Sequence, residues 1–323
     1  MKMVAGWIIV AVAGVLGPAG AVSAQAYPSK TVRLIVPFPA GGGSDIVGRI
    51  LAQKLTDLLK QQVFVDNRGG AGGSIGTEAA TRAAPDGHTM VLASTSEIAV
   101  NPAIYKLTYD TTRDLTAIAM VASTPIVVIV HPSLPVKMVK DLVALAKARP
   151  KEIFVASAGN GTFTHLSGEL FRTVANVHWT HVPYKGAPPA LADLASGQVQ
   201  VMFSSLPAAV GLINAGRVKA IAVSTVQRSD TLPAVPTVKE SGVPQYEVEY
   251  WYGIFVPSAT SKNIVARLHQ EIMQALRAQD VIANLAKQGA VPGTLSQPQF
   301  ADLVRSEVAK WGKVARDSGA KVD

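Results

Sequence analysis

The sequence predicts an α/β protein that folds into two lobes. Short apolar segments rich in Val and Ile alternate along most of the chain with segments whose apolar residues recur at helical spacing. Two of the apolar segments, Thr31–Val36 and Ile153–Ala156, run into loops of glycine and other small residues that precede helices. The C-terminal part is helical and belongs to neither half alone. We therefore expect two sheet-containing halves connected by strands that cross near residues 123–126 and 246–251.

The first segment, Thr31–Val36, is β-branched at four of its six positions, which is typical of a buried strand. Two prolines follow and end the strand, because proline cannot donate to a sheet ladder. Gly41–Gly43 then let the backbone approach another molecule closely, and Ser44 or Asp45 can cap a helix over Ile46–Lys60. A helix start of this kind presents free N–H groups and a partial positive charge, which suits an anion. A tight turn without a ligand is the alternative.

This glycine loop matches neither of the common phosphate-binding patterns. Gly41 and Gly43 lack the third glycine of G-x-G-x-x-G because Ile46 stands in its place, and no lysine follows as in a P-loop. The loop therefore indicates an anion other than a nucleotide phosphate.

The rest of the first half contains two more strand patterns, Gln62–Asp66 and His88–Ala93. A glycine-rich turn over residues 67–74 and a helix over residues 75–84 lie between them, and Ser94–Glu97 follows as a loop and helix cap. This alternation predicts a parallel sheet whose loops lie at the carboxyl ends of the strands, where ligands of open α/β sheets bind.

The second half repeats the order of strand, small-residue loop and helix. Its second helix start is the loop Ser157–Thr162. The expected strands are 116–121, 126–131, 153–156, 177–183, 199–203 and 220–224. The expected helices are 138–148, 163–174, 187–195 and 206–215. The chain then continues as a long aromatic extended segment, Tyr246–Val256, and ends in helices over 264–277, 281–287 and 300–318.

Residues 1–26 have the pattern of a cleavable signal peptide. Lys2 is their only charge, an apolar stretch follows it, and Ala24–Ala26 offers an A-x-A cleavage site. We therefore expect a soluble mature protein in the periplasm. A membrane anchor is the alternative, which the shortness of the apolar stretch disfavours. The chain has no cysteine, so disulfides and thiolate metal sites are excluded.

The charge pattern argues against nucleic acid as a partner. The formal net charge is +8 over 323 residues, aromatic residues make up only 6%, and no basic stripe is present. A mild positive field of this kind would instead attract an anionic small molecule.

One motif raises the alternative of an exported serine hydrolase. Gly72–Gly76 fits G-x-S-x-G with Ser74 as the nucleophile, and Asp193 and His269 follow later in the chain. The hydrolase elbow needs a strand that runs directly into the serine, whereas a glycine-rich turn intervenes here. The histidines show no spacing typical of a metal site, so we expect no metal and no cofactor.

Several motifs together resemble the Bug (TctC-like) family, the extracytoplasmic solute receptors of tripartite tricarboxylate transport systems. The similarity covers essentially the whole mature chain in the right order. The matching segments are Pro37–Asp45, Val65–Gly73, Ala84–Thr89, Ser157–Thr162 and His181–Gly186.

The resemblance implies a two-lobe Venus-flytrap receptor with the type II periplasmic-binding-protein fold. It places residues 27–124 and 249–323 in the first lobe and residues 125–248 in the second. It also implies that the first glycine loop takes one carboxylate of a small ligand, partly through ordered waters, while Ser157–Thr162 takes the other end. Ser94 and Thr95 match a further loop of the cleft. The expected partners are a small mono- or dicarboxylate and a membrane transporter or a sensor, and we expect a monomer that is not an enzyme.

One departure from the family pattern bears on the ligand. Family members often carry an acidic residue after the Met-Phe of the strand at Val201, where this chain has Ser204. An acid there could pair with a ligand ammonium and serine cannot, which favours a carboxylate without an amino group. The candidate ligand-binding residues are Phe38, Ala40, Gly41, Gly42, Ser44, Asp45, Ser94, Thr95, Ser157, Gly159, Asn160, Thr162, His165, Tyr184 and Ser204.

Overall fold

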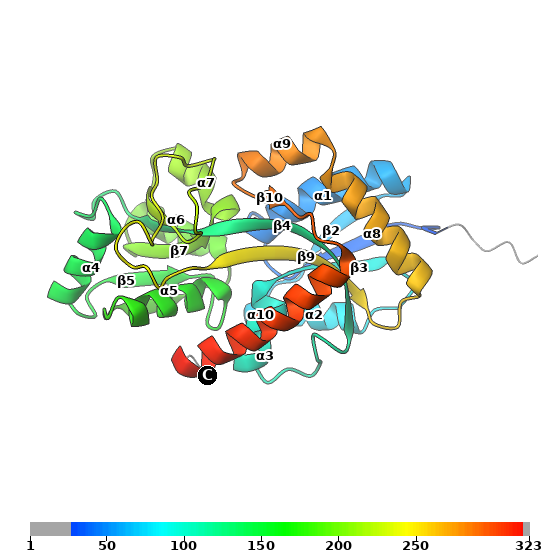
Figure 1. The fold of residues 1–323 in the computed structure, drawn as a ribbon, viewed down its shortest axis with the longest axis horizontal. Coiled ribbons are helices and arrows are strands. Elements are labelled where there is room, and N and C mark those ends of the chain that lie inside the picture. Colours follow the sequence, from blue (N-terminus) through cyan, green and yellow to red (C-terminus); the bar gives the residue numbers. More distant parts are fainter. Residues whose placement is uncertain (1–26, 319–323) are drawn as a thin grey trace, which may run out of the picture.

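The computed structural model describes residues 27–318, so the predicted signal peptide lies outside the described residues. Two α/β lobes lie side by side, and the long strands β4 (Leu115–Val130) and β9 (Glu249–Pro257) run between them (Figure 1). The two-lobe architecture agrees with the expectation from the sequence. The lobe limits at residues 124/125 and 248/249 stay a prediction.

In the first lobe, β1 (Val32–Val36) lies between β2 (Val63–Asn67) and β3 (Thr89–Ser94) and is parallel to both. The next strand, β9, is antiparallel to β3. The parallel arrangement expected for the first three strands is confirmed, and β9 joins them as an antiparallel fourth strand. The chain leaves this lobe along β4 and returns along β9, and two such strands must run in opposite directions.

The second lobe has a similar mixed sheet. β5 (Phe154–Ser157) is parallel to β6 (Thr180–Pro183) and β7 (Val201–Ser205). The last residues of β4 pair antiparallel with β7 and with β8 (Lys219–Val223). The short strand β10 (Val291–Pro292) pairs with β4 near its middle. β4 therefore belongs to the sheets of both lobes.

The sequence predicted two strands where β4 is continuous, and this expectation is wrong. Residues 122–125 were expected to separate the two strands, but they lie within the continuous strand, including Pro125, which has no N–H group to donate. In the structure its partner is Glu249, the first residue of β9, so the missing donor falls at the end of that ladder. Irregularities in the pairing between Ala117 and Ala122 bend the strand along its course.

Helices cover the sheets of both lobes. α1 (Gly43–Leu59) begins three residues before the expected start, because Gly43–Asp45 already belong to the helix and Gly42 is its N-cap. Two short helical turns, η1 (Ala71–Gly73) and the π-helical η2 (Ser96–Val100), lie at the ends of loops facing the second lobe. The other helices are α2 (Ser74–Thr81), α3 (Asn101–Ile104), α4 (Val139–Ala148), α5 (Phe163–Val174), α6 (Ala187–Ser196), α7 (Leu206–Asn214), α8 (Lys262–Leu276), α9 (Gln279–Lys287) and α10 (Gln297–Ser318).

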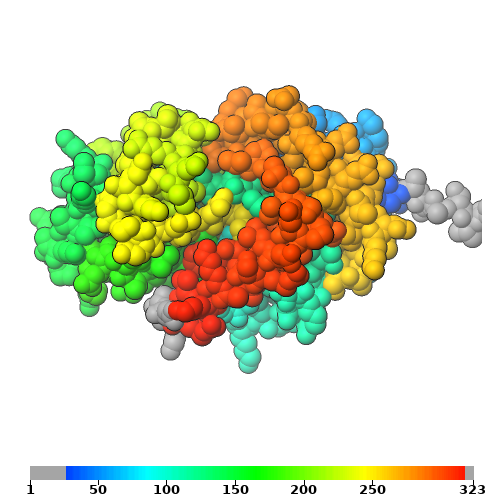
Figure 2. Space-filling view, in the orientation of Figure 1, coloured from blue at the N-terminus to red at the C-terminus, as the bar shows by residue number. Residues whose placement is uncertain are grey.

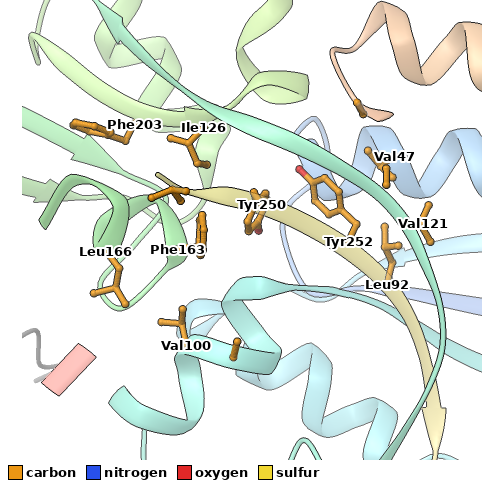
Figure 3. Packing of buried hydrophobic residues seen from close by; sticks show 14 of the residues in the cluster. Val47, Leu92, Val100, Val121, Ile126, Phe163, Leu166, Phe203, Tyr250 and Tyr252 are labelled. Atoms are coloured by element: carbon orange, nitrogen blue, oxygen red, sulfur yellow. The ribbon is translucent and has the colours of Figure 1, made fainter. Parts of the chain in front are cut away.

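One buried apolar cluster extends through both lobes (Figure 3). At the boundary, the Phe163 ring at the start of α5 lies 4.8 Å from the Tyr250 ring of β9 and 4.5 Å from the Trp311 ring of α10. Figure 2 shows α10, in red, reaching from the first lobe to the second. These contacts hold the lobes against each other. Within residues 27–318, no helix has the length and apolar character needed to cross a membrane.

Candidate functional site

A small cavity lies between the lobes, where the starts of α1 and α5 approach each other. Its volume is about 30 Å³, which is room for a water molecule, so the lobes are closed on each other. None of the described side chains that line it is charged. They are Phe38, Pro39, Gly42, Gly43 and Ser44 from the first glycine loop, Ser96, Tyr250 and Tyr252, and Ala158, Thr162, Thr164, Ala187, Pro188 and Ser205 from the second lobe.

The start of α1 supplies hydrogen-bond donors to this cavity. The first amides of a helix have no carbonyl partner within the helix, and those of Gly43 and Ser44 have none elsewhere in residues 27–318. A Cβ on Gly43 would lie 2.5 Å from Ser205 Oγ and 2.6 Å from Tyr252 Oη, so only glycine fits. The free amides and the positive end of the helix dipole favour an anion at this point.

Asp45 lies behind the loop and holds it. Its carboxylate accepts hydrogen bonds from Gly41 N at 2.9 Å, from Asn67 Nδ2 at 3.0 Å and from Arg49 Nε at 3.0 Å. Burial would raise the pKa of Asp45, but these hydrogen bonds outweigh it and lower the pKa below its ordinary value. Asp45 and Gly41 thus fix the shape of the loop through their hydrogen bond. Neither of them lines the cavity, and Ala40 does not line it either.

Tyr252 places an unpaired hydroxyl at the cavity. The side chain is fully buried, and the hydroxyl makes no hydrogen bond of acceptable geometry with any described residue, although Ser205 lies beside it. Burial raises the pKa of Tyr252, so the group is a neutral donor. An unpaired buried hydroxyl costs free energy. A ligand oxygen at the start of α1 would satisfy it. Figure 3 shows the side chains of Tyr250 and Tyr252 on β9.

The amides of the loop Ser157–Thr162 and of the start of α5 are largely used within the protein. The pairs are Ala158 N with Thr164 Oγ1 at 3.1 Å, Gly159 N with Ser157 Oγ at 3.2 Å, Gly161 N with His165 Nδ1 at 3.1 Å and Phe163 N with Ser96 Oγ at 3.0 Å. Thr162 and Thr164 line the cavity, but their hydroxyls pair with each other at 2.9 Å and Thr162 Oγ1 donates to the Gly159 carbonyl at 2.8 Å, so the expected row of free amides is absent from this side of the cavity in the described residues.

Two histidines support this loop from behind. The rings of His165 and His181 are stacked 3.9 Å apart, and His181 Nε2 lies 2.7 Å from Ser157 Oγ. Burial lowers the pKa of both to about 4, so both are neutral at physiological pH. His165 and Ser157 therefore orient the loop and do not line the cavity. No cluster of three or more potential metal ligands occurs in the described part of the chain.

Ser94 and Thr95 also lie one layer behind the cavity. Ser94 Oγ donates to Glu97 Oε2 at 2.7 Å, and Thr95 Oγ1 accepts a hydrogen bond from Trp251 N at 3.1 Å. Glu97 is completely buried, and burial raises its pKa to about 7 despite the hydrogen bonds from Ser94. The residue of this segment that reaches the cavity is Ser96.

A groove of about 560 Å³ adjoins the cavity and shares Phe38, Pro39 and Ala158 with it. Its walls come from both lobes, and Tyr105 Oη of the first lobe donates to the Asn160 carbonyl of the second at 2.6 Å. The walls are residues 69–73 and Tyr105 on one side and residues 158–160 and 184–186 on the other. Three candidate residues, Gly159, Asn160 and Tyr184, therefore lie in the groove and not in the cavity.

Ser204, the candidate residue of β7, does not line the cavity, and its neighbour Ser205 does. Ser204 is buried, and its hydroxyl donates to the Ser205 carbonyl at 3.2 Å, whereas the Ser205 side chain lines the cavity. Consecutive residues of a strand point to opposite faces, and the sequence does not say which face is inside when both are buried. The same ambiguity applies to β9, where Tyr250 and Tyr252 line the cavity although neither was among the candidate ligand-binding residues. Gly43, Ser96 and Thr164 neighbour predicted residues and were also missed.

The geometry does not assemble a hydrolase triad around Ser74. Ser74 Oγ accepts a hydrogen bond from Asn101 Nδ2 at 3.0 Å. Asp193 binds the Tyr184 hydroxyl at 2.7 Å, and His269 Nδ1 contacts the Ile118 carbonyl at 2.9 Å. The serine also follows the turn η1 and not a strand, so it lacks the elbow that a nucleophile needs.

Comparison with known proteins agrees with this architecture. The model of a family described as "Tripartite tricarboxylate transporter family receptor" (TctC) matches residues 47–320. Protein BugT of Bordetella pertussis is 37% identical over 317 residues, which cover 98% of this chain and 96% of that protein.

Two solved structures from Rhodopseudomonas palustris are similar along nearly their whole length. The structure of Rpa4515 with adipate has a TM-score of 0.89 and 36% identity and covers 92% of this chain and 100% of that one. The structure of MatC with bound malate has a TM-score of 0.85 and 32% identity and covers 89% of this chain and 99% of that one. The predicted family membership is thus confirmed, and the chain belongs to the Bug/TctC family of periplasmic solute receptors.

Proposed function

We propose that this protein captures a small carboxylate without an amino group between its lobes and delivers it to a tripartite tricarboxylate-type membrane transporter. The observation that carries the proposal is the start of α1. There the free amides of Gly43 and Ser44 and the unpaired hydroxyl of Tyr252 converge on one closed, uncharged cavity. A carboxylate would satisfy all of these donors at once.

The absence of charge in the lining supports an amine-free ligand. An ammonium group buried in the cavity would need an anionic partner. No described Asp or Glu side chain lines it, and the strand that carries an acid in many family members has Ser204 and Ser205. Hydrogen bonds to a charged group contribute about 1.5–3 kcal/mol each, so two amides and a hydroxyl provide enough to hold a carboxylate without a cation.

The closed cavity implies that binding and lobe movement are coupled. The cavity of about 30 Å³ is walled by residues of both lobes, so a carboxylate reaches the start of α1 while the lobes are apart and the lobes then close on it. The relatives Rpa4515 and MatC, whose structures contain adipate and malate, support a carboxylate ligand. The predicted signal peptide would place the receptor in the periplasm, where it meets the transporter as a monomer. A membrane sensor is the other partner for which a closed receptor is suited.

A panel of carboxylates tests the proposal. Thermal melts should shift upward with one or a few mono- or dicarboxylates and stay unchanged with the matching amino acids, because a ligand at 100 times its Kd adds about 2.7 kcal/mol. Calorimetry with the purified protein then gives the Kd. If no carboxylate binds, and ester turnover disappears in Ser74→Ala, the receptor proposal fails and the hydrolase alternative holds.

A further inference from the structure

A buried carboxyl group lies directly behind the proposed carboxylate site. Glu97 of η2 is completely buried, and none of the ion pairs within residues 27–318 includes it. Its Oε1 atom has no hydrogen-bond partner among the described residues and lies against Gly73, where a Cβ would come within 2.6 Å of it. An ionised carboxylate in such a place is costly, so the surroundings favour the protonated form.

The other oxygen of Glu97 begins a chain of hydroxyl groups that ends at the cavity. Glu97 Oε2 lies 2.5 Å from Ser94 N and 2.7 Å from Ser94 Oγ, and Ser94 Oγ lies 2.6 Å from Tyr250 Oη. Tyr250 lines the cavity. Each hydroxyl has one proton to donate, so the direction of donation at the Glu97 end sets the direction at the cavity end.

The protonation state of Glu97 fixes this direction. An ionised carboxylate only accepts, so Ser94 donates to Glu97, Tyr250 donates to Ser94, and the Tyr250 hydroxyl has no proton left for the cavity. In the protonated form the proton finds an acceptor from Oε2, namely Ser94 Oγ, because Oε1 has no partner in the described residues. Ser94 then donates to Tyr250, and the Tyr250 hydroxyl is free to donate to a ligand oxygen.

We propose that Glu97 is a positioning residue for carboxylate binding: its protonated form turns the Tyr250 hydroxyl toward the ligand, and binding is accompanied by proton uptake. The ionised form opposes the ligand twice, because it turns this donor away and adds a second negative charge behind the site. The charge of Glu97 acts at the cavity, since it contributes to the raised pKa values of Tyr250 and Tyr252. The inference rests on the proposed function, since it needs a carboxylate at the start of α1.

The tyrosines and histidines near Glu97 stay in one state around neutral pH. Burial raises the pKa of Tyr109 to about 12 and also raises the pKa values of Tyr250 and Tyr252, so all three stay neutral. Burial lowers the pKa of His165 and His181, in the second lobe, to about 4. η1, β3 and α3 contribute no titratable side chain. The charged groups described on α2 and α10 are the ion pairs Glu78–Arg82, Asp302–Arg305 and Glu307–Lys310 and the exposed Lys313 and Arg316.

The test measures carboxylate binding as a function of pH. Adipate, malate and the other carboxylates of the panel are titrated calorimetrically at pH 6, 7, 8 and 9 into wild type, Glu97→Gln, Tyr250→Phe and Glu152→Gln. Glu152 is an exposed acid of the second lobe, so its variant removes a carboxylate elsewhere. Buffers with different ionisation enthalpies give the number of protons taken up on binding, and melting temperatures at each pH show that all four proteins are folded.

The Kd of wild type should rise about 10- to 100-fold from pH 6 to pH 9, because one hydrogen bond to a charged group is lost and one proton changes Kd at most tenfold per pH unit. Binding at pH 8 should take up as much as one proton. Glu97→Gln should bind with a Kd that does not depend on pH and without proton uptake, whereas Glu152→Gln should behave as wild type. Tyr250→Phe should bind more weakly than wild type at pH 6 and lose most of the pH dependence.

A wild-type Kd that stays constant from pH 6 to pH 9 would overturn the role of Glu97 while the proposed function stands. So would a pH dependence that persists undiminished in Glu97→Gln or in Tyr250→Phe. A wild type that binds no carboxylate at any pH would overturn this inference and the proposed function together.

Discussion

Gly43 is the residue on which the proposed carboxylate site depends most. It lies where the first glycine loop, β7 and β9 meet, with Ser205 and Tyr252 against its Cα. Its amide is also one of the free donors at the start of α1. A single added methyl group therefore pushes apart the three segments that form this end of the cavity.

Gly43→Ala should weaken carboxylate binding about 10- to 150-fold, the effect of losing one hydrogen bond to a charged group. The measurement is calorimetric titration with whichever carboxylate the panel identifies. Gly211→Ala is the matched control, because a Cβ there meets nothing within 4 Å. If Gly43→Ala binds as tightly as the control, the carboxylate does not lie against this amide.

Asp45 and Ser204 show what residue types alone reveal about the site. The consecutive glycines before a helix drew attention to the loop at the start of α1, and residues of this loop line the cavity. The sequence did not reveal that Asp45 would turn inward to Gly41 N and Arg49, or that Ser205 and not Ser204 would face the cavity. Both outcomes depend on which face of an element is turned inward when all of its faces are buried.

Among the elements, the segment from the end of β3 through η2 connects the two lobes. Glu97 Oε2 accepts from the Ser94 amide at 2.5 Å, and the Tyr250 hydroxyl of β9 donates to Ser94 Oγ at 2.6 Å. Ser96, at the first position of η2, accepts the Phe163 amide of the second lobe at 3.0 Å. A π-helical turn is common at functional sites. Here it directs the Ser96 side chain toward Phe163 of α5 and the Glu97 side chain back to Ser94 of β3.

Glu97 should make the stability of this segment depend on pH. Its pKa is raised by burial from 4.5 to about 7 in the folded protein. Between these values the folded state keeps its proton and the unfolded state has lost it, so the free energy of unfolding falls as pH rises through this window. The fall should reach about 3 kcal/mol, since one pKa unit corresponds to about 1.4 kcal/mol.

Glu97→Gln cannot titrate and should gain stability relative to wild type as pH rises from 4.5 to 7. Urea unfolding at a series of pH values measures the difference. Glu152→Gln, at an exposed position of the second lobe, should parallel wild type. Parallel curves for wild type and Glu97→Gln would show that Glu97 is ionised in the folded state across this range.

At the scale of the whole molecule, a few direct contacts hold the lobes closed. Tyr105 Oη donates to the Asn160 carbonyl, and Ser96 Oγ accepts from Phe163 N. The Phe163 ring also packs on Trp311 of α10. Each hydrogen bond contributes about 0.5–1.5 kcal/mol net, so these contacts bias the equilibrium toward closure without locking it.

Tyr105→Phe should shift the ligand-free protein toward the open form by about 2- to 13-fold, the factor that corresponds to one such hydrogen bond. Small-angle scattering should then show a larger radius of gyration that returns to the wild-type value with saturating ligand. Tyr184→Phe is the control, because its hydroxyl binds Asp193 within the second lobe. An unchanged radius for Tyr105→Phe would mean that this bond does not contribute to closure.

The overall architecture could be predicted from the sequence, whereas the details of the strands that cross between the lobes could not. Alternating strand and helix patterns indicated two α/β halves, and the resemblance to the Bug (TctC-like) family indicated the fold and the receptor class, which the comparisons confirm. The continuity of β4 could not be predicted. It depends on Pro125 falling opposite Glu249 at the end of a ladder, and such pairing arises only once β9 has returned from the second lobe.

A crystal structure of the protein with its bound carboxylate tests the central claim most directly. We predict one carboxylate within hydrogen-bonding distance of the amides of Gly43 and Ser44 and of the Tyr252 hydroxyl, in a closed cleft. A carboxylate bound elsewhere, with these three donors still unpaired or bonded to protein groups, would contradict the account.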